Sequence, residues 1–112
     1  MVFSDYMYKT DASLNKTRVI VMITDLNLWV MKVDNYSLIN HVPLSELTKI
    51  LTIQTNSSIF ALNFSSSFAL FLESVRRTEF VLFLLSVCDT DPSRTSRPEI
   101  TKSLKLQLSS RN

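Results

Sequence analysis

The chain has 112 residues and contains no glycine. Glycine is the residue that enters left-handed backbone conformations without steric cost. P-loops, dinucleotide-binding fingerprints and EF-hand loops all require it at fixed positions. The sequence therefore excludes those nucleotide- and calcium-binding sites, and its turns have to be built from Asp, Asn and Ser.

Short β-branched and aromatic runs fill the first two thirds of the chain. The most secure element is a hairpin over residues 18–33, in which "RVIVMIT" and "LWVMK" flank a short Asp/Asn turn. A first strand is expected within residues 1–8 and a polar loop over 10–17. Polar breaks such as "NSS" and "SSS" separate the later runs, as in antiparallel meanders. These later strands are expected in "SLINHVPL", "TKILTIQT", "IFALNF" and "FALFLE".

The hydrophobic period changes after Ser74, which we interpret as an N-cap. Residues 75–88 are predicted to form one helix, since apolar side chains recur at helical spacing. The core stripe consists of Phe80, Phe83, Leu84 and Val87. Three apolar side chains are then left over, and either a protein partner or the final strand should cover them. This predicted partner interface is Val81, Leu82 and Leu85.

The end of the chain is predicted to be a linker followed by a strand. Residues 89–99 contain two prolines, two aspartates and two arginines among Ser and Thr, a composition typical of a linker. Residues 100–112 begin with "ITKSLKLQL", whose alternating leucines indicate a half-buried strand. We therefore divide the chain into a core of residues 1–88, the linker, and a C-terminal strand and tail.

Composition restricts the possible functions further. One cysteine, Cys88, and one histidine, His41, cannot form a conventional zinc site or an intrachain disulfide, and no paired side chain marks either as catalytic. We therefore expect no cofactor, no metal and no enzymatic activity. A formal charge of +2 does not indicate nucleic-acid binding, which usually requires a strongly basic surface. The longest apolar stretch is too short to span a bilayer, and no signal peptide is evident, so a cytoplasmic location is expected.

Several segments resemble the tail-homology-1 region of class I myosins. The most specific is "PLSELTKI" at residues 43–50, which follows the "NLWVMK" strand at the family's spacing, and the similarity extends over about residues 2–87. The resemblance implies a pleckstrin-homology-like antiparallel β-sandwich of about seven strands that binds anionic phospholipid. It places Lys9 and Arg18 on the two basic positions beside the phosphate-binding loop, where Lys16 is the only basic residue. Because a hairpin brings its strand ends together, Lys32 is added to this predicted head-group site.

Two functions follow as hypotheses. The first is a non-enzymatic module that weakly recognises anionic phospholipid at a membrane surface, as myosin tails do. The second is a structural, protein-binding subunit of a cytoskeletal or ciliary assembly, such as an axoneme, with no lipid ligand. The few basic residues in the 10–17 loop and the strongly apolar helix motivate the second hypothesis.

Overall fold

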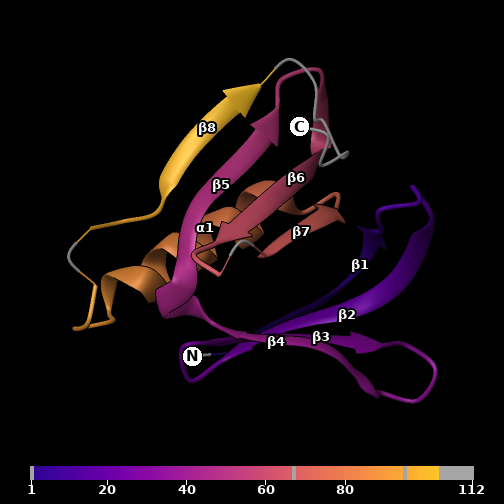
Figure 1. Ribbon diagram of the computed structural model, residues 1–112, viewed down its shortest axis with the longest axis horizontal. Coiled ribbons are helices and arrows are strands. Elements are labelled where there is room, and N and C mark those ends of the chain that lie inside the picture. Colours follow the sequence, from indigo (N-terminus) through magenta and orange to yellow (C-terminus); the bar gives the residue numbers. More distant parts are fainter. Residues whose placement is uncertain (1, 67, 95, 104–112) are drawn as a thin grey trace.

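The computed structural model describes residues 2–66, 68–94 and 96–103. These residues form eight strands, one α-helix and one 3₁₀ turn, shown in Figure 1. In chain order the elements are β1 (Phe3–Thr10), β2 (Lys16–Thr24), β3 (Asn27–Lys32), β4 (Leu38–Pro43), η1 (Leu44–Glu46), β5 (Leu47–Ile53), β6 (Asn56–Phe64), β7 (Phe68–Glu73), α1 (Arg77–Asp89) and β8 (Glu99–Ser103).

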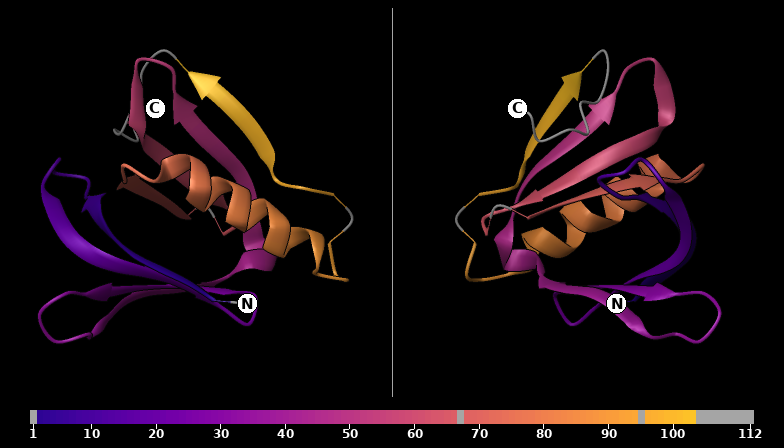
Figure 2. Two further views of the ribbon diagram at one scale, coloured as in Figure 1. Left: turned by 180° about the vertical axis from the view of Figure 1, so that it is seen from behind. Right: turned by 45° about the vertical axis from the view of Figure 1, so that its right-hand side comes forward.

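The strands form one continuous sheet in the order β4-β3-β2-β1-β7-β6-β5-β8. It folds over on itself where β1 meets β7 through only three paired residues, Tyr8 to Thr10. Two layers result, β1–β4 and β5–β8, and the helix crosses the open side between them (Figure 2). All pairings are antiparallel except that of β8, which runs parallel to β5.

This architecture confirms the predicted mainly-β sandwich with one helix and an additional C-terminal strand. The expected hairpin over residues 18–33 is present as β2 and β3, paired from Val19–Lys32 to Thr24–Asn27. The predicted C-terminal strand is seen as β8. Its leucine-rich part, within residues 104–112, lies outside the described residues.

Because the chain has no glycine, other residues adopt the left-handed backbone conformation in its turns. Asp25 and Leu26, between β2 and β3, have φ angles of 50° and 65°. Positive φ at both central residues defines a type I′ turn, whose twist matches that of a hairpin. Leu14 in the β1–β2 connection and Tyr36 in the β3–β4 connection also adopt positive φ.

The helix begins later than predicted, at Arg77, with Arg76 rather than Ser74 at the N-cap position. The backbone N–H of Ser74 donates to the carbonyl of Ser58 at 2.9 Å, so the sheet ladder holds Ser74 at the end of the strand. Its hydroxyl still accepts a hydrogen bond from the backbone N–H of Arg76 at 3.0 Å. The predicted cap therefore stabilises the turn that leads into the helix.

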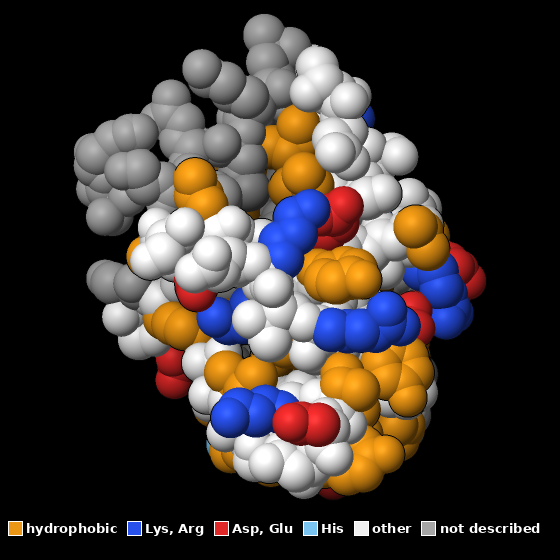
Figure 3. Space-filling view, turned by 90° about the vertical axis from the view of Figure 1, so that its right-hand side faces the viewer, with side chains coloured by type: hydrophobic (Ala, Val, Ile, Leu, Met, Phe, Trp, Pro, Cys, Tyr) orange, Lys and Arg blue, Asp and Glu red, His pale blue; other side chains and the backbone are white. Residues whose placement is uncertain are grey.

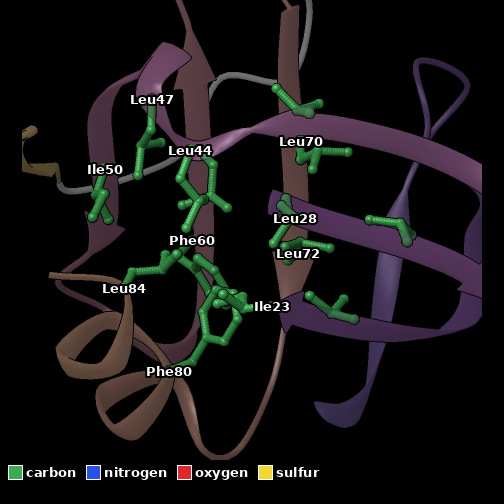
Figure 4. Packing of buried hydrophobic residues seen from close by; sticks show 14 of the residues in the cluster. Ile23, Leu28, Leu44, Leu47, Ile50, Phe60, Leu70, Leu72, Phe80 and Leu84 are labelled. Atoms are coloured by element: carbon green, nitrogen blue, oxygen red, sulfur yellow. The ribbon is translucent and has the colours of Figure 1, made fainter. Parts of the chain in front are cut away.

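The core lies between the two layers and is closed by the helix. Figure 4 shows Phe80 and Leu84 of α1 directed toward Phe60 of β6 and Ile23 of β2. The ring of Phe80 lies 5.3 Å from that of Phe3 in β1 and 5.5 Å from that of Phe60. One helical side chain thus joins both layers.

Two arginines attach the helical region to the β5–β6 layer through backbone carbonyls. The guanidinium of Arg77 donates to the carbonyls of Ile53, Asn56 and Ile59, at 3.3, 2.9 and 3.0 Å. That of Arg94, in the segment predicted as a linker, donates to the carbonyls of Leu44 and Leu47, both at 2.9 Å. These contacts tie both arginines to the backbone of η1, β5 and β6.

We predict that Arg77→Met lowers the free energy of unfolding by about 2–3 kcal/mol, because hydrogen bonds from a charged donor are lost while the carbonyls stay partly buried. The matched control is Arg76→Met. Arg76 forms exposed ion pairs with Asp5 and Glu79, which contribute little to stability. Urea denaturation of both variants measures the difference, and equal losses would contradict the role of Arg77.

Candidate binding surface

The four predicted head-group residues divide between the two faces of the sheet. Lys9 lies two residues after the buried Met7 on β1 and so shares its side, and Lys32 lies opposite the buried Val19. Both therefore point to the inner side of the β1–β4 layer. Lys16 and Arg18 alternate with Val19 on β2 and point to the outer side. The register therefore places two of the four on each side of the sheet, since a one-residue offset in a strand moves a side chain to the opposite face. Their role in head-group binding stays a prediction.

The two outer cations already have partners within the chain. Lys16 Nζ lies 2.7 Å from Glu73 Oε1 on β7. The guanidinium of Arg18 lies 5.1 Å from the ring centre of Tyr6 and 5.7 Å from that of Tyr8, and it donates to the Tyr8 hydroxyl at 3.5 Å. Arg18 is held by aromatic rings, and none of the ion pairs among the described residues includes it.

In the connection between β1 and β2, the carboxylate of Asp11 binds backbone amides of the same loop. Asp11 Oδ1 accepts hydrogen bonds from the backbone N–H groups of Ser13 and Asn15, both at 2.9 Å. The backbone N–H of Leu14 donates to the Asp11 carbonyl at 2.9 Å. These amides would be the natural donors to a phosphate in this loop, and here they bind an acidic side chain.

The outer face of β1–β4 carries a surface that the sequence analysis did not single out. Strand register places Tyr6, Ile20, Met31 and Leu38 in one row across all four strands. Tyr6 is 51% exposed and Leu38 is 55% exposed. A sheet that faces water normally shows polar side chains on that side, so an apolar row here is a candidate contact surface.

A second row lies beside it and contains Met22, Trp29 and His41. The rings of Trp29 and His41 stack with centroids 4.0 Å apart and an angle of 9° between their planes. Trp29 Nε1 donates to Thr24 Oγ1 at 2.8 Å, and His41 Nε2 lies 3.0 Å from Asn27 Oδ1. His41 thus has a structural role in holding the Trp29 ring flat on the sheet.

We call these two rows, together with Tyr8 and Arg18, the outer face. The register assigns no Asp or Glu to it. Figure 3 shows hydrophobic side chains gathered in the lower half of the view, where β1–β4 lie, with Lys and Arg side chains nearby. The outer face is therefore apolar and aromatic, with Arg18 as its charged group.

The sequence contained a signal for this surface. In β2 and β3, most of the side chains on the inner side and most of those on the outer side are apolar, as in "RVIVMIT" and "NLWVM". Near-continuous apolar runs are typical of strands that are covered on both faces. The core covers one side of β2 and β3, and among the described residues no helix lies on the other (Figure 2).

The predicted partner interface on the helix is smaller than expected. Leu85 is only 7% exposed and belongs to the core, and Val81 is partly buried against it. Leu82 is 61% exposed. The reason is that α1 lies between the two layers, so β1 contacts one side of it and β6 another. Leu85 is therefore not available to a partner, and Leu82 alone of the three is strongly exposed.

Cys88, in the last turn of the helix, is buried, and burial raises the pKa of its thiol. A raised pKa disfavours the reactive thiolate. No group of three His, Cys, Asp or Glu residues in the described part of the chain could hold a metal ion. Nor does any helix there have the length and apolar character needed to cross a membrane.

Comparison with solved structures identifies the fold. A sandwich of two sheet layers closed by a C-terminal helix is the architecture of pleckstrin-homology domains, and solved structures that contain such domains align with most of this chain. A human RhoA complex with the DH/PH fragment of PDZRhoGEF aligns with a TM-score of 0.71 and 10% identity, over 81% of this chain and 29% of that chain. The PH domain of human oxysterol-binding protein-related protein 11 aligns with a TM-score of 0.64 and 14% identity, over 86% of this chain and 92% of that chain. The C-terminal PH domain of pleckstrin aligns with a TM-score of 0.62 and 10% identity, over 79% of this chain and 94% of that chain.

The chain thus has a pleckstrin-homology-like fold, as the sequence predicted. No protein-family model and no curated protein sequence matches it. The finer resemblance to class I myosin tails stays a prediction.

We predict opposite outcomes for two leucines three residues apart on α1. Leu85→Asp should unfold or strongly destabilise the domain, because it buries an unpaired charge in the core. Leu82→Asp should leave the melting temperature nearly unchanged, since that side chain is exposed. Thermal denaturation followed by circular dichroism tests both, and a large loss for Leu82→Asp would mean that the chain itself covers this position.

Proposed function

We propose that this domain is a non-catalytic protein-binding module whose contact surface is the outer face of β1–β4. The observation that carries the proposal is the row of Tyr6, Ile20, Met31 and Leu38, which is apolar on the side of the sheet away from the core. Contiguous apolar patches of this kind mark interaction sites in folded proteins.

The composition of the outer face is that of a protein interface. Tyr, Trp, Met and Arg are enriched at such interfaces, whereas acidic residues are depleted at their centres. Trp29 and Tyr6 supply rigid aromatic area, and Met22 and Met31 adapt to a partner's shape. Arg18 is fixed between two tyrosine rings, which lowers the entropy cost of pairing it with a carboxylate.

The charge of this surface indicates the chemistry of the partner. Arg18 has no carboxylate partner among the described residues, and the face presents no acidic side chain of its own. The complementary surface is therefore an apolar patch of another protein that carries at least one Asp or Glu opposite Arg18. A cytoskeletal or ciliary assembly, as the sequence suggested, would be a suitable setting for such a module.

Lipid recognition, the other hypothesis, has less support from the geometry. Of the four predicted cations, Lys9 and Lys32 alone share the inner side, Lys16 is paired with Glu73, and the loop amides bind Asp11. Phosphate recognition needs several cations and donors that converge on one point. Lys9 and Lys32 are the residues through which weak binding to an anionic membrane would act.

The protein-binding proposal predicts that Tyr6→Glu/Leu38→Glu abolishes association without unfolding the domain, because both positions are exposed and place a charge at each end of the apolar row. Cross-linking mass spectrometry in cells should recover partner peptides linked to β1–β4 for the natural chain and lose them for the variant. Leu82→Glu, an equally exposed change on the helix, is the control. Unchanged cross-links in the double variant would refute the proposal.

The lipid hypothesis makes a separate prediction. Retention by phosphoinositide-containing vesicles should be weak, and Lys9→Glu/Lys32→Glu should remove it, whereas Arg18→Gln should have little effect because it faces the other side. Cosedimentation at low and physiological salt measures this. Strong retention that depends on Lys9 and Lys32 would instead favour the membrane as the ligand.

A further inference from the structure

Strand β4 forms one edge of the sheet and is paired with β3 on one side only. Natural proteins usually protect such edges with charged side chains, because the unpaired backbone N–H and C=O groups can pair with another chain. The opposite edge strand, β8, carries Glu99 and Lys102. In contrast, β4 has the sequence "LINHVP", which contains no Asp, Glu, Lys or Arg. The edge of β4 is therefore suited to pairing with an extended segment.

The strand register shows which backbone groups of β4 are available for this pairing. The backbone N–H of Leu44 donates to the carbonyl of Leu26 at 2.8 Å, and hydrogen-bonded pairs occur at every second residue of an antiparallel ladder. Val42 and Asn40 lie two and four residues before Leu44 in the same register, so their backbone groups face β3. The backbone N–H and C=O of His41, which lies between them, face the free edge.

A pocket of about 290 Å³ lies along this edge. The consecutive residues 40–43 of β4 form one wall. The other wall is formed by Glu46 of η1, by Ser66 in the β6–β7 turn and by Phe68 at the start of β7. A segment that paired with His41 would therefore lie beside the pocket, and one of its side chains would be able to enter it.

The pocket contains two acceptor groups that lack partners in the described part of the chain. The Oδ1 atom of Asn40 is buried and accepts no hydrogen bond there. The carboxylate of Glu46 takes part in none of the ion pairs among the described residues. A side chain that donates several hydrogen bonds and carries a positive charge would satisfy both groups. The chemistry of the pocket therefore favours Lys or Arg.

Strand geometry defines the neighbouring position of the segment. In an antiparallel arrangement, the residue opposite His41 exchanges two backbone hydrogen bonds with it and has its side chain on the same side of the sheet. On that side the His41 ring stacks on Trp29 at 4.0 Å, so an apolar or aromatic side chain fits there. The next residue of the segment lies opposite Asn40, with its side chain on the side of Asn40.

We propose that the partner adds an extended segment antiparallel to β4, with an apolar side chain beside His41 and, at the next position, a Lys or Arg side chain between Asn40 and Glu46. This inference rests on the protein-binding function proposed above and specifies how the partner engages the edge of the outer face. Backbone pairing contributes affinity, and the two side chains contribute specificity.

The test begins with selection of phage-displayed random dodecapeptides on the full chain. Enriched peptides should carry Lys or Arg directly after an apolar or aromatic residue. Glu46→Lys should weaken binding of an enriched peptide by about tenfold or more, because repulsion replaces attraction. Changing the basic residue of the peptide to glutamate should restore binding to this variant.

The matched control is Glu99→Lys on the opposite edge strand, which should leave the affinity for the peptide unchanged. Fluorescence anisotropy with labelled peptide measures all of these affinities. Equal affinities for the Glu46→Lys and Glu99→Lys variants would overturn the proposal, as would enriched peptides without a basic residue.

Amide hydrogen exchange followed by nuclear magnetic resonance locates the bound peptide. Exchange of the His41 amide should slow on binding, and slowed exchange confined to β8 would overturn the proposal. Lost cross-links in the Tyr6→Glu/Leu38→Glu variant without protection of His41 would overturn the edge pairing and leave the outer face as the partner surface. Protection of His41 with unchanged cross-links would instead overturn the role of the outer face.

Discussion

The contact of Phe80 with Phe3 and Phe60 is the interaction on which the rest of the structure depends. The sheet is continuous but is held at its fold by three paired residues between β1 and β7, so its layers need a further connection. Phe80 supplies it, since one ring packs on the first strand of one layer and on the central strand of the other. A helix that did this with a single apolar stripe would leave both layers partly open, which explains why α1 is apolar over most of its surface.

This arrangement also determines where binding can occur. The inner sides of both layers are occupied by the core and by α1, and the backbone carbonyls at the end of the β5–β6 layer are taken by Arg77 and Arg94. Surfaces for partners are therefore left on the outer sides. The outer side of the β1–β4 layer carries the aromatic and Met-rich face.

Much of the fold could be predicted from the sequence, because strand propensity, polar breaks and a change of period are local signals. The hairpin over residues 18–33 and the single helix were found in this way. The candidate site was less predictable, because it depends on which alternate residues of a strand face outward. Arg18 and Thr17 differ by one position, and sequence alone could not tell which of the two faces inward. The same applies to Leu85, which belongs to the core cluster built from both layers, and to Arg94, whose carbonyl partners come from η1 and β5.

The turns of this glycine-free chain affect the free energy of both its folded and its unfolded state. Leu14, Leu26 and Tyr36 hold left-handed backbone conformations that cost about 1–2 kcal/mol each for residues with a Cβ atom. A glycine at each position would relieve this strain in the folded state, but it would also widen the conformational freedom of the unfolded chain. The folded domain therefore stores strain at its connections while its unfolded state is comparatively restricted. Its turns therefore fix the strand register at a cost in free energy that glycine turns would avoid.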